Sequence, residues 1–543
     1  MALILVSGAT QVKGPPTPLY RVLYGIELSP VKPSMHDYTG EMPLSRRAFL
    51  SSTGAQALAQ PLPRDHGVRK PNLVLFMPET IRAESLGCYG HPVVRTPNID
   101  RLAQQGVRFT QCHVQNTVCG PSRCSLMTGW PVHVRGHRSL YYLLHQDEPN
   151  LFRYLKQNGY DVHWFGKNDL LGADSFSSSV TDWDSRPPRI PAPRNPWPQS
   201  DPHYYSFLFG PAGDRRDTAD YANVQDAFRV LERSEKPFCI FLPLSYAHPP
   251  FSAPAGFHDM YNPAKLPPLR PVNLPRKPNF FEAIRRTRRL DQLSDPDFRK
   301  IQAVYLGMIS YSDWLLGELL EKIEATNHAS DTAVFLLSDH GEWGGDYGLV
   351  EKWPSAMDDA LSHVPLIARV PGCAEGHVSR EIVELYDVMA TCLDLADIRA
   401  EHTHFAHSLR RQLHGEPGDP GRAAFCEGGY NRYEPQCFEP MADFNSPTDI
   451  YYPKVALQNE HPETITRTTS IRTLEYKLIL RPDGQSELYD LRKDPRELHN
   501  VFGSKLYASQ QETLRGRLLD WYVRTSDVAP WKQDGRGFPM RAS

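Results

Sequence analysis

The chain has 543 residues, and its 60 Lys and Arg residues nearly balance its 63 Asp and Glu residues, for a formal net charge of −3. This balance argues against a nucleic-acid polyanion as the main partner. A hydrophobic content of 40% argues against wholesale disorder, and the length predicts one large core with a smaller second unit. The longest apolar runs are strand-sized, so no transmembrane segment is predicted.

The first 71 residues contain an extension and a targeting pattern, and they are set apart from the fold. SRRAFL at residues 45–50 is a twin-arginine pattern, and ALA at residues 57–59 has the small-x-small form of a cleavage site. This pattern predicts export to the periplasm or the extracellular space. The alternative is a disordered basic tail without a targeting signal, which would leave the protein cytoplasmic.

Residues 72–400 alternate strand and helix patterns, which is typical of an α/β domain with a mostly parallel central sheet and helices on both faces. Apolar runs predict strands, which lie at residues 71–77, 107–114, 160–166, 236–246 and 332–339. Amphipathic patterns predict helices, which lie at residues 97–105, 121–127, 150–159, 220–233, 297–326 and 382–398. Thr96 is expected to cap the first helix, with Pro97 at its first position and Gly106 at its end.

Two stretches of this domain lack a regular pattern and are predicted to be long loops. Residues 174–215 are rich in Pro, Ser and Asp, and residues 249–295 are also irregular. Loops of this length are commonly functional, so we expect both to shape a substrate pocket. Residues 275–289 within the second loop include six basic residues. They fit either a rim that binds an anionic glycan or the solvated face of a helix.

Residues 401–528 predict a smaller C-terminal α+β unit, followed by a tail at residues 529–543. Residues 469–491 alternate and are interrupted by PDG at residues 482–484, which predicts an antiparallel hairpin. An amphipathic pattern predicts a final helix at residues 509–525.

The nine cysteines show no C-x-x-C pair and no regular spacing, so neither a zinc ribbon nor a dense disulfide framework is indicated. Cys426 and Cys437 could pair if the protein is exported. Most of the others are expected to be small buried hydrophobic residues.

Charged or polar side chains follow each predicted central strand, and they are the candidate metal-binding and catalytic residues. They are Glu79, Thr80, Lys167, Asp169, His248, Asp339, His340 and, shortly after the last strand, Lys352. Ligands of α/β sheets collect at the carboxyl ends of strands. Glu79 and Asp339 are hard oxygen donors suited to Ca²⁺ or Mg²⁺, whereas Lys167, His248 and Lys352 suit an oxyanion. Together they predict a site for a sulfate or phosphate ester.

The segment VCGPSRCSLMTGW at residues 118–130 leaves three interpretations open. It could be a nucleophile site, half of a metal site, or a helix start that happens to carry a cysteine. A nucleophile at a helix start would benefit from backbone N–H groups that favour developing negative charge.

The chain resembles the type I, formylglycine-dependent sulfatases of the alkaline phosphatase superfamily. CGPSRCSLMTG at residues 119–129 is similar to their signature C-x-P-S-R-x-x-L-x-T-G. Further similar stretches lie at residues 86–90, 96–109, 338–341, 364–372 and 487–500. The resemblance covers roughly residues 71–528 in matching order. It implies an alkaline-phosphatase-like α/β domain with a smaller C-terminal domain, and hydrolysis of a sulfate monoester on a small molecule or glycan.

The resemblance also implies roles for individual residues. Cys119 would be oxidised to Cα-formylglycine by a maturation enzyme, and the hydrated aldehyde would attack sulfur and later expel sulfate. Arg123 would hold the hydrate, Lys167 and Lys352 would grip the sulfate oxygens, and His248 would face the leaving oxygen. The implied metal is Ca²⁺, with Mg²⁺ as the alternative. Its implied ligands are Glu79, Thr80, Cys119, Asp339 and His340.

Two departures from the family pattern stand out. Glu79-Thr80 replaces the common Asp-Asp or Asp-Asn, Asp-Gln or Asp-Glu pair, so one formal negative charge is lost relative to Asp-Asp, and weaker metal binding is expected. Asp169 stands where many sulfatases have a histidine that assists sulfate release, so Asp169 is the candidate substitute base.

Two alternative functions stay open. The protein could be a phosphonate or phosphate ester hydrolase on the same scaffold, or a non-catalytic exported protein that binds an oxyanion or glycan.

Overall fold

The computed structural model describes residues 70–183, 193–439 and 446–528. By contacts, the chain divides into residues 1–67 and 68–543, and every described residue lies in the second unit. The predicted export signal and the tail at residues 529–543 lie outside the described residues. The domain limits at residues 72, 400 and 528 stay predictions. Among the described residues, no helix is long and apolar enough to cross a membrane.

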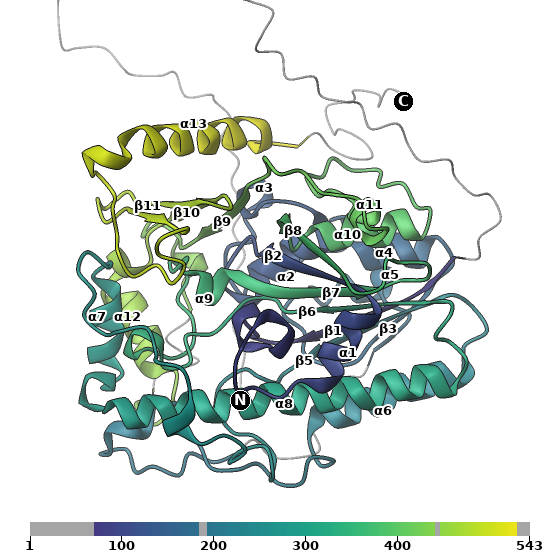
Figure 1. The fold of residues 1–543 in the computed structure, drawn as a ribbon, viewed down its shortest axis with the longest axis horizontal. Helices are drawn as coiled ribbons and strands as arrows, with labels where there is room; N and C mark the ends of the chain where they lie inside the picture. Colours follow the sequence, from purple (N-terminus) through teal and green to yellow (C-terminus); the bar gives the residue numbers. More distant parts are fainter. Residues whose placement is uncertain (1–69, 184–192, 440–445, 529–543) are drawn as a thin grey trace, which may run out of the picture. The chain divides into compact units, whose positions relative to one another are not determined.

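An eight-stranded sheet forms the centre of the large α/β part, with strand order β4-β3-β5-β1-β6-β7-β2-β8 (Figure 1). Its strands are β1 Asn72–Pro78, β2 Val107–His113, β3 Asp161–Trp164, β4 Asp182–Trp183, β5 Phe238–Leu244, β6 Thr332–Leu337, β7 His363–Arg369 and β8 His377–Glu384. Strand β1 pairs in parallel with β5 and β6, while β7 runs antiparallel to β6 and β2. The predicted mostly parallel sheet is confirmed.

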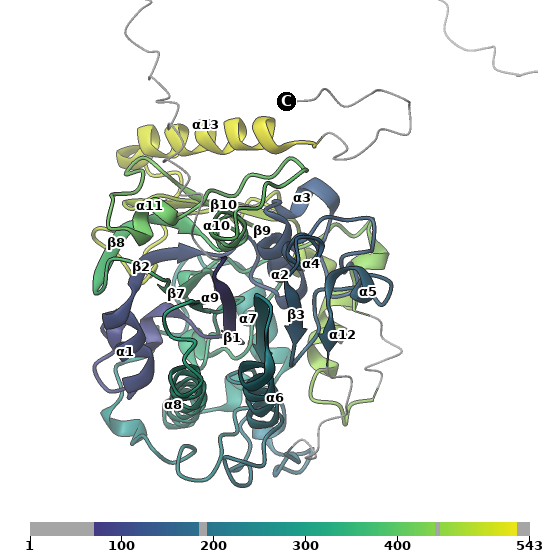
Figure 2. The same ribbon diagram turned by 90° about the vertical axis from the view of Figure 1, so that its right-hand side faces the viewer.

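Helices cover both faces of this sheet, and alternate residues of β1 show why (Figure 2). Leu73, Leu75 and Met77 pack in one core with α2 Cys119–Thr128, α4 Leu151–Gln157 and α10 Asp387–Leu395. Val74 and Phe76 pack in another core with α1 Pro97–Gln105, α6 Ala219–Arg233 and α8 Asp295–Ala325. A strand buried on both faces must be apolar at every position, which explains the continuous run that predicted it.

A four-stranded antiparallel sheet, in the order β12-β11-β10-β9, forms the core of the smaller part. Its strands are β9 Ala424–Gly428, β10 Thr468–Arg472, β11 Tyr476–Leu480 and β12 Glu487–Asp490. Helix α13, Ala508–Thr525, lies across it and packs Leu514, Leu518 and Trp521 onto the sheet (Figure 1). The short helices are α3 Val132–Arg135, α5 Phe176–Ser179, α7 Phe280–Thr287, α9 Asp359–Ser362, α11 Arg410–Leu413 and α12 Tyr452–Glu460.

Several predicted elements were wrong in detail. The helix expected at residues 382–398 begins only at Asp387, because the preceding residues extend β8 beside β2. The predicted hairpin is part of a three-stranded meander, since a second turn separates β10 from β11. Helix α7 lies inside the predicted loop at residues 249–295.

Local contacts at helix starts also differ from expectation. Helix α2 begins at Cys119, two residues before Pro121. Thr96 does not cap α1 with its side chain, because its Oγ1 accepts from Gly87 N at 3.0 Å and donates to Asp100 Oδ1. The carboxylate of Asp313 on α8 accepts from Ile99 N at 2.7 Å instead, so a neighbouring helix satisfies this orphan N–H group.

Candidate active site

The predicted site residues converge at the carboxyl edge of the large sheet. Glu79 and Thr80 follow β1, Lys167 and Asp169 follow β3, His248 follows β5, Asp339 and His340 follow β6, and Cys119 and Arg123 lie in the first turns of α2. One ligand atom each from Glu79, Cys119, Asp339 and His340 lies within 4.8 Å of the others. The structure therefore brings residues from three separate segments into one buried cluster.

Cys119 is the first residue of α2 and is only 2% exposed. Its Sγ donates to Glu79 Oε1 at 2.9 Å and lies 3.1 Å from His340 Nε2. Burial and the nearby Glu79 charge raise the pKa of the Cys119 thiol well above its ordinary value. The unmodified thiol is therefore protonated at neutral pH and is a poor nucleophile as it stands.

Arg123 is fully buried one turn further along α2 and joins the two carboxylates of the cluster. Its Nε and Nη2 both lie 2.9 Å from Asp339 Oδ2, and Nη2 lies 3.5 Å from Glu79 Oε1. Burial alone would raise the pKa of Asp339 and Glu79, but nearby cations, Arg123 among them, outweigh it and lower both pKa values. Both carboxylates are thus held in the charged form.

The cluster fits a hard divalent cation. Glu79 Oε2 is buried without a hydrogen-bond partner among the described residues, and Asp339 supplies a second carboxylate. His340 Nδ1 lies 2.8 Å from Gly341 O, which makes Nδ1 the donor and leaves the Nε2 lone pair directed at the cluster. Burial lowers the pKa of His340, so the imidazole is neutral, as a metal ligand must be.

Thr80 enters the site mainly through its main chain. It adopts a φ of 60°, its N–H donates to Asp339 Oδ1 at 3.3 Å, and Tyr305 donates to its carbonyl at 2.7 Å. Its Oγ1 is buried and has no hydrogen-bond partner in the described part of the chain. The hydroxyl is therefore a candidate neutral ligand beside the two carboxylates.

Lys167 bridges the cluster and Asp169. Its Nζ lies 2.7 Å from Glu79 Oε1 and 2.9 Å from Asp169 Oδ2. Burial opposes the charged amine, but the Glu79 charge outweighs it and raises the pKa of Lys167. Lys167 is thus held in the charged form, and Asp169 lies in contact with its Nζ.

His248 and Lys352 form a second pair. Lys352 Nζ donates to His248 Nε2 at 2.5 Å, and His248 Nδ1 therefore donates to Pro249 O at 2.6 Å. Burial and the charge of Lys352 lower the pKa of His248 to about 3, so the ring is neutral. In this arrangement Nε2 is an acceptor from Lys352.

A cavity of about 350 Å³ opens beside these residues. Glu79, Lys167 and His248 belong to its lining. The lining also includes Pro193, Met308 and residues within the ranges 212–220 and 245–252. Both predicted loops therefore contribute to the wall of the cavity, as their lengths led us to expect.

Two supporting residues were missed by the sequence analysis. Ser338 Oγ donates to Pro78 O at 2.8 Å and accepts from Ile81 N at 2.9 Å, which ties the end of β6 to the end of β1. Ser338 lies beside Asp339, so its position was a usable signal. Tyr305 lies in the middle of α8, and nothing in its local pattern distinguishes it from a core residue.

A mostly parallel α/β sheet carries carboxylates, cations and a buried cysteine at its carboxyl edge, an arrangement suited to a hydrolase of oxyanion esters. The family model named Sulfatase matches residues 71–398, which is more than half of the chain. The chain belongs to the sulfatase family and is a sulfuric ester hydrolase. A second model, the C-terminal region of N-sulphoglucosamine sulphohydrolase, matches residues 434–524.

Similar proteins support this assignment. The N-acetylglucosamine-6-O-sulfatase of Bacteroides thetaiotaomicron is 25% identical over 542 residues, covering 86% of this chain and 89% of its own. The phosphonate monoester hydrolase of Agrobacterium radiobacter has a TM-score of 0.68 at 22% identity, covering 87% of this chain and all of its own. A structure in complex with D-glucosamine-2-N,6-O-disulfate has a TM-score of 0.66 at 21% identity, covering 84% and 98%. The two solved structures confirm the fold.

Proposed function

We propose that this sulfatase removes sulfate from a saccharide that contains glucosamine, using a formylglycine derived from Cys119. One observation carries the mechanism: Cys119 Sγ lies between Glu79 Oε1 and His340 Nε2 in a cluster whose other members are charged or metal-ligating. The substrate class is supported by the names of the relative and of the C-terminal family model.

The aldehyde and the metal would supply chemistry that the unmodified chain lacks. The hydrated aldehyde supplies an oxygen nucleophile that can later expel sulfate, which a thiol cannot do. Glu79, Asp339, His340 and the side chain at position 119 would hold Ca²⁺, or else Mg²⁺, with Thr80 as a further ligand. That cation supplies stabilisation of negative charge on the sulfate oxygens. The modification requires a maturation enzyme as partner.

The remaining residues act on the anion and on protons. Lys167 is a fixed cation at the cavity wall and would hold one sulfate oxygen. Lys352 would exchange its bond to His248 for a second sulfate oxygen. His248 would then be free to face the leaving oxygen, and Arg123 keeps both carboxylates ionised beneath the reacting centre.

The substrate assignment is tested with a panel of sulfated glucosamines, other sulfated sugars, an aryl sulfate and an aryl phosphonate. The proposal predicts the highest kcat/KM on a sulfated glucosamine. A higher kcat/KM on the aryl phosphonate would favour the phosphonate hydrolase alternative. A fully thiol Cys119 with no turnover of any ester would favour the non-catalytic binding protein.

An Asp169→Asn variant is expected to turn over about 10²-fold to 10⁴-fold more slowly, because it removes the candidate base for sulfate release. Lys167 keeps its Glu79 partner, so substrate binding should change less than kcat. Rapid-mixing assays with an aryl sulfate would show one fast release of the phenol followed by a slow steady rate. Unchanged turnover would remove Asp169 from the mechanism.

A Thr80→Asp variant is expected to bind Ca²⁺ several-fold more tightly, because it adds a carboxylate beside Glu79 and Asp339. Asp adopts a φ of 60° more readily than the β-branched Thr, so no backbone penalty is expected. Calorimetry on chelator-treated protein measures the affinity. Thr80→Asn is the matched control, because asparagine has the shape of aspartate but carries no charge. Equal affinities for the wild type and Thr80→Asp would contradict the expectation.

We also propose that the protein is exported, on the basis of the twin-arginine pattern at residues 45–50. Fractionation of the native host would test this, since retention in the cytoplasm would oppose it.

A further inference from the structure

The residue before Lys352 has an unusual conformation. Glu351 has a φ of 71°, in the left-handed region that side chains other than glycine rarely adopt, and it is 1% exposed. A glycine would satisfy this backbone more easily, so the presence of a buried glutamate points to a role for its carboxylate.

Three charged groups hold Glu351. Arg288, just after α7, donates to Glu351 Oε2 at 2.7 Å, and Lys454 of α12 donates to Glu351 Oε1 at 3.0 Å. The main-chain N–H of Glu351 donates to Glu342 Oε1 at 2.5 Å. The side chain of Glu351 is thus held by two cations and its main chain by Glu342, so the residue from which Lys352 continues is held at both its side chain and its backbone.

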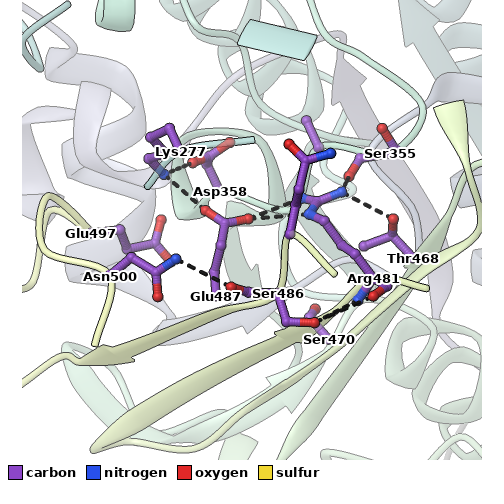
Figure 3. A network of polar contacts seen from close by, with 12 residues as sticks. Lys277, Ser355, Asp358, Thr468, Ser470, Arg481, Ser486, Glu487, Glu497 and Asn500 are labelled. Carbon is purple, nitrogen blue, oxygen red and sulfur yellow. Dashed lines mark hydrogen bonds and ion pairs between the residues drawn. The ribbon is translucent and has the colours of Figure 1, made fainter. Parts of the chain in front are cut away.

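A second network of buried charges, several residues beyond Lys352, ties Ser355 and Asp358 to the C-terminal sheet, as Figure 3 shows. Arg481, the residue after β11, donates to Ser355 O at 2.7 Å, and Lys277 lies 2.7 Å from Asp358 Oδ1. Glu487 of β12 joins the two cations, at 3.1 Å from Arg481 and 3.4 Å from Lys277. These groups are buried, so their interactions are little screened by solvent.

We propose that Glu351 is a positioning residue that fixes Lys352 against the sulfate group. The inference rests on the proposed role of Lys352 as a sulfate ligand. Glu351 Oε1 lies 3.7 Å from Lys352 Nζ, and the carboxylate also holds the backbone from which that side chain extends. Through Arg288 and Lys454, the end of α7 and helix α12 thereby contribute to the position of a catalytic residue.

The test compares Glu351→Gln with Glu487→Gln. Each variant neutralises a buried glutamate that two cations outside the catalytic site hold, so both should lower Tm. Only Glu351→Gln should lower kcat/KM for an aryl sulfate, by roughly 10-fold to 100-fold, because a small displacement of a binding group has effects of this size. It should also weaken binding of inorganic sulfate, measured by calorimetry. Equal losses in both variants would overturn the proposal.

A double-mutant cycle with Lys352→Met separates a loss of activity that acts through Lys352 from a loss caused by general destabilisation of the protein. If Glu351 acts through Lys352, adding Glu351→Gln to Lys352→Met should cause no further loss of kcat/KM, and an additive loss would overturn the proposal. If Lys352→Met itself binds sulfate and turns over normally, the role of Lys352 is wrong and the proposal falls with it. If Lys352→Met is impaired but Glu351→Gln is not, only the positioning role is wrong. Should Glu351→Gln fail to fold, Lys454→Gln removes one of the cations that hold Glu351 and takes the place of Glu351→Gln in the same cycle.

Discussion

Replacing Cys119 by alanine is expected to lower kcat for sulfate-ester hydrolysis by about 10⁴-fold or more, the effect of removing a covalent nucleophile. The variant should still fold, since alanine fits the space of the cysteine and starts a helix equally well. Steady-state assays on an aryl sulfate and thermal unfolding measure the two effects. Cys124→Ala is the matched control: Cys124 is also buried in α2, and its Sγ contacts Tyr142 O and Leu170 O at 3.9 Å and the side chain of His137, outside the cluster.

Mass spectrometry of the peptide that contains Cys119 distinguishes formylglycine from a thiol. Active protein from the native host should carry the aldehyde mass at position 119 and an unmodified thiol at Cys124. A fully active enzyme with an intact Cys119 thiol would contradict the proposed chemistry, and so would a Cys119→Ala variant that retains normal turnover.

Replacing Arg123 by methionine is expected to destabilise the fold by about 3–5 kcal/mol, the cost of leaving a buried charge without its partner. Asp339 loses both of its 2.9 Å contacts and Glu79 loses one of its cations. Activity should fall as well, because the two carboxylates lose their fixed geometry. Urea unfolding in the presence of a chelator measures the stability, and added Ca²⁺ should restore part of it by neutralising the same carboxylates.

The stability that Arg123 contributes should decrease as the pH falls. In the wild type the pKa values of Asp339 and Glu79 are lowered, so their stabilising contribution is present at neutral pH and is lost as the pH falls. The stability difference between the wild type and Arg123→Met should therefore narrow in acid.

Arg422→Met is a suitable control for Arg123→Met. Arg422 is also mostly buried between two carboxylates, at 3.1 Å from Glu384 and 2.6 Å from Asp387. Its replacement should reduce stability in the same way but leave kcat unchanged and show no rescue by Ca²⁺. Loss of stability without rescue in both variants would argue against a cation at the cluster.

The parts of the fold that sequence analysis predicted are those with a local signal. Strands β1, β5 and β6 are buried on both faces, so they are continuous apolar runs. The reactive residues follow such strands directly, and that is why most of the cluster could be assembled from the sequence. Strand β8 was missed because its residues merge with the helical pattern of α10.

Long-range ion pairs had no local signal. Lys277 and Arg288 lie in a basic stretch, which favoured a rim or a solvated face, but both side chains are buried. Their partners, Asp358 and Glu351, lie more than 60 residues away in the chain. No pattern within the stretch encodes partners at that separation, so only the folded structure could reveal their role.

The burial of Cys119 also has a consequence for timing in the cell. With 2% of its surface exposed, the side chain cannot be reached by a second protein once α2 has packed onto the sheet. The maturation enzyme proposed above would therefore have to act while the polypeptide is newly made and still unfolded. If the protein is synthesised faster than the maturation enzyme can act, some molecules would fold with an unmodified Cys119 and be inactive. The specific activity of a preparation would then depend on the rate of synthesis.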